Sequence, residues 1–318
     1  MAKKRATRKK VTAKKPAAEP AHIYDRLRDP LLFVDTNILL DFYRARTPQQ
    51  LSLLDRIDSV RDKIICTYQV EMEFKKNRQK SIAESLKAMK CDTVIKVPAY
   101  LDNNRSVRSA RGNLQTASHS LELARKTLER ALHNPTSHDP VYKVVQRLFQ
   151  CNTEINLTRD NNIRYRIRRL AWKRFILGYP PRKANDTSTG DAINWEWIVN
   201  CAMARNCDVI VVSRDSDFGI NVSKKSYIND WLAQEFKQRV GKHHKILLTP
   251  RLTDGLQILQ QQVTKKELQG EEELIGRSGA TRGDKYEDLL RSFMANIHDT
   301  DFYLKLSKPP HEQGSAES

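Results

Sequence analysis

Acidic residues stand just after apolar runs, or early in helix-like segments, at four separate places in this chain. Asp35 follows an apolar run in L-L-F-V-D-T-N, and Asp215 and Asp217 follow another in V-I-V-V-S-R-D-S-D-F. Asp191 lies in G-D-A-I-N-W, and Glu73 lies in Q-V-E-M-E-F. Carboxylates held about 4 Å apart repel by roughly 1 to 4 kcal/mol per pair, depending on the dielectric. A cluster of these acids needs protons or cations, and we interpret it as a divalent metal site.

Two nearby glutamates compete for a place in this cluster. Glu71 and Glu73 are two residues apart, which is about 200° around a helix, so only one can face the other acids. Glu71 has Lys75 four residues on, a spacing that suits a solvated ion pair. Glu73 lies beside the apolar Val70 and Phe74. We therefore choose Glu73.

Strand-like and helix-like segments alternate around the acids. Short apolar runs at residues 31–34, 63–66, 208–212 and 245–248 predict strands, and helical patterns follow them. This alternation predicts βαβ units and a parallel sheet, whose carboxyl ends gather ligand-binding residues. Asp35 or Asp191 taken alone would equally suit a helix start, where an acid gains about 0.3 to 1 kcal/mol. Their common placement at strand ends and helix starts favours a shared site.

The chain divides into four predicted parts. The α/β domain is discontinuous and covers residues 23–90 and 186–262. Residues 91–185 have several helical patterns and no convincing strand, so they are predicted to form a helical insertion. Residues 1–22 are a basic arm predicted to be disordered, because this segment cannot bury enough apolar surface to fold alone. Residues 263–318 are a helical C-terminal extension and tail.

The charge of the chain indicates a polyanionic partner. The 318 residues carry a net charge of +18, with 39% hydrophobic and 30% charged residues. Nucleic acid is the leading candidate. A membrane is disfavoured because no apolar run approaches the ~20 residues that span a bilayer. The five cysteines are odd in number and form no C-x-x-C pair, which argues against a disulfide framework and for a reducing cytoplasm.

An arginine-rich helix is predicted from about Asp160 to Leu177. The residues expected on one apolar face, with basic and aromatic side chains beside it, are Ile163, Ile167, Leu170 and Leu177. Such a mixture suits a groove that holds phosphates and stacks bases, although a solvated helix face would also be charged. The predicted nucleic-acid-binding residues are Arg164, Arg166, Arg168, Arg169, Lys173, Arg182 and Lys183.

The order and flanks of the motifs resemble those of the PIN-like domain nucleases. The resemblance is carried by D-T-N after the first strand, V-E-M-E-F on an early helix, G-D-A-I-N-W on a late helix and S-R-D-S-D-F after the next strand. It covers roughly residues 30–90 and 186–250, and is greatest to a bacterial PIN-like subgroup with a long helical insertion. The resemblance implies a three-layer α/β/α sandwich with a mostly parallel central sheet.

The resemblance also implies a metal-dependent endoribonuclease with one or two Mg²⁺ or Mn²⁺ ions. Asp35 and Asp191 would be the principal metal ligands, with Glu73 and Asp215 as further acids of the catalytic site. Asp217 matches a less regular metal-ligand position of the family. Because no histidine is required to activate a ribose hydroxyl, cleavage is expected to leave 5′-phosphate and 3′-hydroxyl ends.

Two alternative functions stay open at the level of sequence. The chain could be a non-catalytic nucleic-acid-binding module on a PIN-like scaffold, or a structure-specific DNA nuclease. The biological role could be that of a toxin or a defence effector, with an antitoxin or a defence-system protein as partner. A second copy of the chain is the remaining candidate partner.

Overall fold

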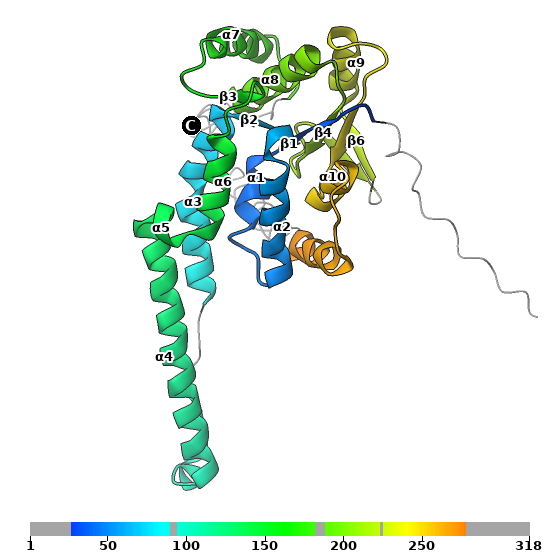
Figure 1. The fold of residues 1–318 in the computed structure, drawn as a ribbon. Helices are drawn as coiled ribbons and strands as arrows, with labels where there is room; N and C mark the ends of the chain where they lie inside the picture. The colour runs from blue at the N-terminus through cyan, green and yellow to red at the C-terminus, as the bar shows by residue number, and fades with distance from the viewer. Residues whose placement is uncertain (1–26, 90–93, 182–187, 223–224, 278–318) are drawn as a thin grey trace, which may run out of the picture.

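A five-stranded parallel sheet forms the centre of the molecule. The structure is a computed structural model that describes residues 27–89, 94–181, 188–222 and 225–277. The strands run in the order β3-β2-β1-β4-β7, and every neighbouring pair is parallel (Figure 1). They are β1 (Leu31–Val34), β2 (Ile64–Thr67), β3 (Asn156–Leu157), β4 (Val209–Val212) and β7 (Ile246–Thr249). A separate antiparallel pair, β5 (Gly219–Val222) and β6 (Lys225–Ile228), packs beside β7.

Helices cover both faces of the sheet. In Figure 1 one layer above the sheet contains α7, α8 and α9, and the layer below it contains α1, α2, α6 and α10. The longer helices are α2 (Pro48–Ser59), α3 (Tyr68–Ala88), α4 (Arg105–His133), α6 (Pro140–Phe149), α7 (Ile163–Ile176), α8 (Gly190–Arg205) and α9 (Asp230–Arg239). The shorter ones are α1 (Thr36–Asp41), α5 (Pro135–His138), α10 (Leu252–Ile258) and the 3-10 turns η1 (Arg61–Lys63) and η2 (Ala99–Leu101). The arrangement confirms the predicted α/β sandwich.

The central strands are continuous apolar runs because both of their faces are covered. Every residue of β1, β2 and β4 is buried. A parallel strand between two helical layers is expected to lose the alternation that marks a half-exposed strand. The buried Trp195 and Trp197 of α8 add the largest side chains of the core. The acids that follow these buried runs therefore lie at the ends of the strands.

A long helical arm projects from this body. In Figure 1 α4 extends well beyond the end of α3, and its 29 residues correspond to a length of about 44 Å. Only Ala131 of α4 is buried. At that end the buried Arg78 of α3 forms an ion pair with Asp139 and donates to the carbonyl of Ala131. This buried ion pair anchors the arm to the domain.

The stretch 91–185 differs from the expected purely helical insertion. Within it, β3 pairs with β2 and extends the central sheet. Helix α6 also contributes buried side chains to the main core, among them Val145 and Leu148. A strand of two residues has no periodicity that a sequence pattern could show. The projecting part within this stretch is therefore α4 with its flanking turns.

Helix α7 also differs from its predicted apolar face. It buries Ile167, Ala171 and Arg174, whereas Ile163 and Leu177 are exposed. Arg174 is buried because it pairs with carboxylates on two neighbouring helices, Glu196 of α8 and Glu235 of α9.

Other predictions fall partly outside the described residues. The basic arm 1–22 and residues 278–318 of the C-terminal extension lie outside them, as do Arg182 and Lys183. Within the ranges that the structure describes, no helix combines the length and the apolar content that crossing a bilayer requires.

Candidate active site at the carboxyl edge of the sheet

The parallel sheet brings the ends of β1, β2 and β4 to one edge. Asp35 follows β1 directly and is the N-cap of α1. Glu73 lies in the second turn of α3, which begins immediately after β2. Asp215 and Asp217 follow β4. Parallel strands in register place these three segments side by side, as expected at the carboxyl edge of an α/β sheet.

Asp35 is the most enclosed of these acids, with 5% of its surface exposed. Its carboxylate accepts hydrogen bonds from the Thr36 amide (2.6 Å), the Asn37 side-chain amide (3.0 Å) and the Ser213 hydroxyl (2.5 Å). Burial is the first cause that raises its pKa, and the negative charge of Asp215 is the second. The pKa rises to about 7, although the bonds from Ser213 and Thr36 act in the opposite direction. Burial and the neighbouring negative charge together therefore outweigh the hydrogen bonds that stabilise the Asp35 carboxylate.

Glu73 faces this site, and Glu71 faces away from it. Glu73 accepts hydrogen bonds from the Thr36 hydroxyl at 3.1 Å and from the side-chain amide of Gln69 at 2.6 Å. Its charge is a further cause that raises the pKa of Asp35. Glu71 instead pairs with Lys75 at 2.5 Å on the surface. The choice between the two glutamates follows from their rotation around α3.

Helix α8 approaches the same edge through its first turn. A Cβ added to Gly190 would lie 2.7 Å from both Glu73 Oε1 and Gln69 Nε2. The glycine thus allows the start of α8 to pack against the Glu73 carboxylate. Asp191, the next residue, is half-buried in this first turn. The N-terminus of α8 is held there by the buried Thr67 hydroxyl, which donates to Asn194 Oδ1 at 2.7 Å.

The two acids after β4 have different surroundings. Asp215 is half-buried, its backbone amide donates to the Ser213 hydroxyl at 3.1 Å, and its charge acts on Asp35. Asp217 is buried, with 7% of its surface exposed. The charges of Glu73 and Asp215 therefore both act on Asp35. Asp191 follows Gly190, the residue of α8 that packs against Glu73.

The chemistry of this group fits a hard divalent cation. Oxygen ligands from carboxylates are those that Mg²⁺ and Mn²⁺ prefer. A cation would also offset the repulsion that raises the pKa of Asp35. Among residues 27–89, 94–181, 188–222 and 225–277, however, no three acidic, histidine or cysteine side chains lie together as a ready set of metal ligands. Glu73 instead accepts hydrogen bonds from Gln69 and Thr36, and Asp35 accepts one from Ser213.

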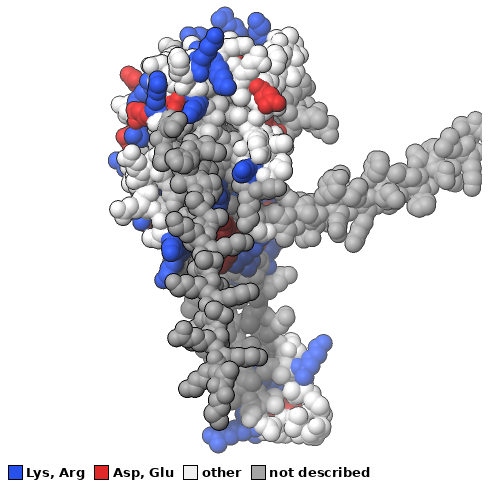
Figure 2. Space-filling view, turned by 90° about the vertical axis from the view of Figure 1, so that its right-hand side faces the viewer, with Lys and Arg blue, Asp and Glu red and all other residues white. Residues whose placement is uncertain are grey.

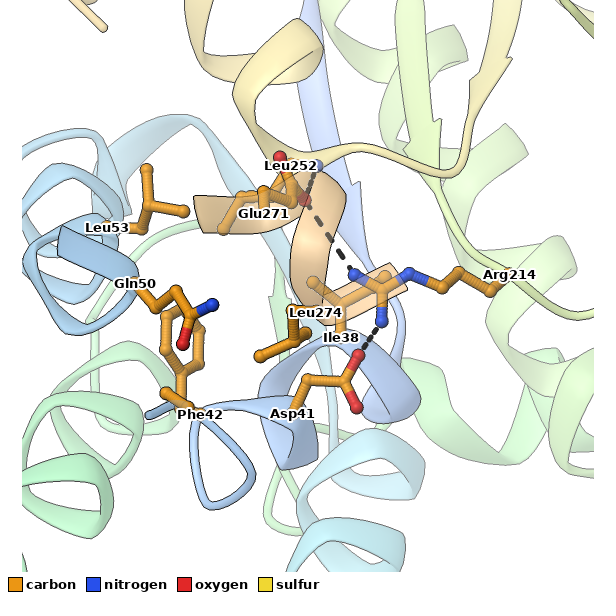
Figure 3. Close-up of a pocket in the computed structure, with 10 residues that line it drawn as sticks. Ile38, Asp41, Phe42, Gln50, Leu53, Arg214, Leu252, Glu271 and Leu274 are labelled. Carbon is orange, nitrogen blue, oxygen red and sulfur yellow. Dashed lines mark hydrogen bonds and ion pairs between the residues drawn. The ribbon is translucent and has the colours of Figure 1, made fainter. Parts of the chain in front are cut away.

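A largely enclosed arginine, Arg214, anchors the segment that carries Asp215 and Asp217. Arg214 lies between Ser213 and Asp215, and Figure 3 shows its guanidinium between Asp41 of α1 and Glu271. Glu271 belongs to the helical residues 265–277 and also accepts from the backbone amides of Leu252 and Thr253 at the start of α10. The sequence patterns did not predict the ion pairs of Arg214. The sequence feature that could have indicated them is the position of this arginine between Ser213 and Asp215.

The basic residues of α7 lie near α8 and the first residue of α3. Burial raises the pKa of Tyr68, and the charges of Arg168 and Arg164 act in the opposite direction, so both guanidiniums lie near it. Tyr68 opens α3 immediately before Gln69. Arg166, on the same helix, donates to Asn200 of α8 at 2.5 Å. Five of the predicted nucleic-acid-binding residues lie within the described ranges, and all five are exposed or half-buried: Arg164, Arg166, Arg168, Arg169 and Lys173.

An α/β sandwich with acids at the carboxyl edge of its sheet is the arrangement that the predicted PIN-like class has, and a family comparison agrees. The family model for the PIN domain matches residues 32–218, more than half of the chain, and the chain belongs to this family. PIN domains are generally metal-dependent nucleases. No curated protein and no solved structure matches the chain.

Proposed function

We propose that the protein is a metal-dependent endoribonuclease whose reaction takes place at the carboxyl edge of the sheet. The observation that carries the proposal is the convergence of Asp35, Glu73, Asp215 and the Asp191 turn at this edge. These four acids would hold Mg²⁺ or Mn²⁺, with Asp217 as an additional ligand. The bound metal supplies Lewis acidity and a water of lowered pKa.

The residues around the acids have distinct roles in this proposal. Ser213, Thr36 and Asn37 orient Asp35 through three hydrogen bonds. Gln69 holds Glu73 in place. A carboxylate of the site would accept the proton that an attacking water releases as its oxygen bonds to phosphorus. The bond from phosphorus to the 3′ oxygen breaks, and that oxygen takes a proton from solvent, which leaves a 5′-phosphate and a 3′-hydroxyl.

RNA binding would use the basic side of α7. Arg164 and Arg168 lie near Tyr68, the first residue of the helix that carries Glu73, so they would hold phosphates of a strand that continues to the acids. The remaining proposed contacts are Arg166, Arg169, Lys173, Arg182 and Lys183. A DNA strand carries the same phosphates as RNA, so DNA stays an alternative substrate.

The test uses labelled single-stranded RNA and DNA with wild type and Asp35→Asn, in Mn²⁺, Mg²⁺ or EDTA. We expect cleavage of RNA that requires metal and is lost in the variant. End analysis should find 5′-phosphates, and 2′,3′-cyclic phosphates would contradict the mechanism. Binding without metal-dependent cleavage would favour the non-catalytic module, and cleavage of DNA alone would favour a DNA nuclease.

A toxin or defence role would require that the nuclease activity harms the cell that produces it. We propose that such a role involves a partner that restrains the enzyme. Induced expression in bacteria should stop growth with wild type and not with Asp35→Asn. Equal growth with both would contradict the toxin role and leave the nuclease assay unaffected.

A further inference from the structure

An aromatic surface is exposed where the end of α7 meets the start of α9. We define it by Trp172, Phe175, Ile176, Tyr179 and Trp231. Trp172 stacks on Phe175 with ring centroids 5.8 Å apart and an interplanar angle of 18°. Tyr179 lies 5.0 Å from Trp231, again between ring centroids. Trp172 is 56% exposed and Trp231 is 46% exposed, whereas isolated monomers seldom expose such contiguous apolar groups without a function.

The surface rests on a rigid base. Arg174, itself 4% exposed, donates to Glu196 of α8 at 3.0 Å and pairs with Glu235 of α9. Arg239 binds both glutamates at 2.8 Å. The indole nitrogen of Trp195 donates to Glu235 at 3.1 Å. This buried network ties three helices together, so the exposed rings above it are preorganised.

The charge around these rings favours a polyanion. Helix α7 contains six arginine and lysine residues and no acid. Only Arg174 of the six is buried. In Figure 2 lysine and arginine side chains line the upper rim of the molecule, the end where Figure 1 places α7 and α9. An aromatic surface on a basic helix is typical of proteins that bind single-stranded nucleic acid.

The basic helix leads from this surface toward the start of α3. Arg164 and Arg168 lie near Tyr68, the first residue of the helix that carries Glu73, whereas Trp172 and Ile176 follow one and two turns further on. The 14 residues of α7 span about 21 Å. A strand of a few nucleotides can therefore contact both ends of the helix.

We propose that the aromatic surface is a base-stacking platform for single-stranded nucleic acid, whose phosphates follow the basic side of α7 toward the acidic edge. The platform would supply the strand that the proposed nuclease cuts. Only the cleavage of the bound strand rests on the proposed function, because binding needs no catalysis. A duplex keeps its bases stacked inside, so it should bind this surface more weakly than a single strand.

The test measures binding in EDTA, where no cleavage interferes. Fluorescence anisotropy with a labelled 12-nucleotide oligouridine is compared for wild type, Trp172→Ala and Trp231→Ala. Loss of one stacked base should weaken binding roughly 5- to 150-fold. Tyr100→Ala is the matched control, since Tyr100 is 82% exposed in η2 on the projecting arm. It should bind like wild type, and circular dichroism checks that each variant is folded.

Intrinsic fluorescence gives a second readout. The chain has four tryptophans, of which Trp195 and Trp197 are fully buried. Bound bases should quench wild-type fluorescence through Trp172 and Trp231. The double variant Trp172→Phe and Trp231→Phe keeps two rings for stacking, so it should retain most of the affinity but lose the quenching.

Two results would overturn the proposal. One is an affinity of both alanine variants within twofold of wild type. The other is a concentration-dependent dimer, seen by sedimentation, that the alanine variants lose while they bind oligouridine normally; the surface would then contact a second copy. A dinucleotide is too short to reach the platform, so its metal-dependent cleavage tests the proposed nuclease separately.

Discussion

The electrostatic cost of the acidic edge is concentrated at Asp35. Burial, and then the charge of Asp215, raise its pKa from 3.8 to about 7. The unfolded chain loses this proton near pH 4, whereas the folded, metal-free protein keeps it until about pH 7. The folded state thus binds the extra proton, and its stability falls as the pH rises from about 4 to 7. Three pKa units correspond to at most about 4 kcal/mol.

This pH dependence can be measured with Asp35→Asn, which removes the charge and keeps the shape. In EDTA at pH 8, the variant should have a free energy of unfolding about 1 to 4 kcal/mol above that of wild type. At pH 4 the two proteins should differ little, because Asp35 is protonated when folded. Urea unfolding at both pH values checks this expectation. A variant that is no more stable at pH 8 would show that Asp35 carries no unfavourable charge.

Gly190 is a second residue whose substitution should have a measurable effect on cleavage. A methyl group there would lie 2.7 Å from Glu73 Oε1 and Gln69 Nε2, and both side-chain ends must move to accommodate it. We therefore expect Gly190→Ala to reduce metal-dependent cleavage by tenfold or more, on the order of 1.4 kcal/mol of barrier. RNA affinity in EDTA should change little, since no phosphate-binding residue moves.

Gly112→Ala is the matched control for this substitution. Gly112 lies in α4 with no atom within 4 Å of an added Cβ. Its replacement should leave cleavage unchanged and stabilise the helix by up to about 1 kcal/mol. Equal cleavage by Gly190→Ala and wild type would mean that the position of Glu73 is not critical.

Among the elements, the C-terminal helical residues 265–277 hold the domain together at its flank. Gln50 of α2 donates to the carbonyl of Gly270 at 2.7 Å. Glu271 accepts two backbone amides at the start of α10 and faces Arg214. This segment therefore acts as a cap for α10 and as a support for the segment that carries Asp215.

Neighbouring glutamates allow a controlled test of this support. Glu271→Ala leaves the amides of Leu252 and Thr253 without their acceptor, and should lower the free energy of unfolding by about 1 to 3 kcal/mol. Glu272→Ala removes an exposed ion pair with Arg251 and should cost less than about 1 kcal/mol. Urea unfolding of both variants checks the difference. If the two lose equal stability, the buried contacts of Glu271 do not anchor the helix.

Sequence patterns predicted the elements whose residues follow one simple rule. The buried runs that became β1 and β4 are apolar throughout, so their residue types alone were enough to place the acids that follow them at one edge. The patterns failed where partners distant in sequence decide the outcome. Arg174 is buried because Glu196 and Glu235 are there, and Arg214 is enclosed because Asp41 and Glu271 are. No local period reports such pairings.

At the scale of the whole molecule, the charge excess is distributed between the folded domain and the terminal arm. Residues 1–22 contain eight of the 56 lysines and arginines and one glutamate. A basic segment of this kind adds affinity for any polyanion through the release of counterions. The acids of the proposed site lie within the described residues of the domain. We therefore expect removal of the arm to change affinity and not catalysis.

Deleting residues 1–22 should weaken binding to RNA of any sequence and reduce its salt dependence. Each lost phosphate contact makes the slope of log K against log salt shallower by about 0.7 for a single strand. Anisotropy in EDTA across a salt series measures this slope, and the turnover of a dinucleotide should not change. A scrambled arm of equal composition should restore binding, because the interaction depends on charge and not on order. If the scrambled arm failed to do so, a specific contact of the arm would replace the electrostatic explanation.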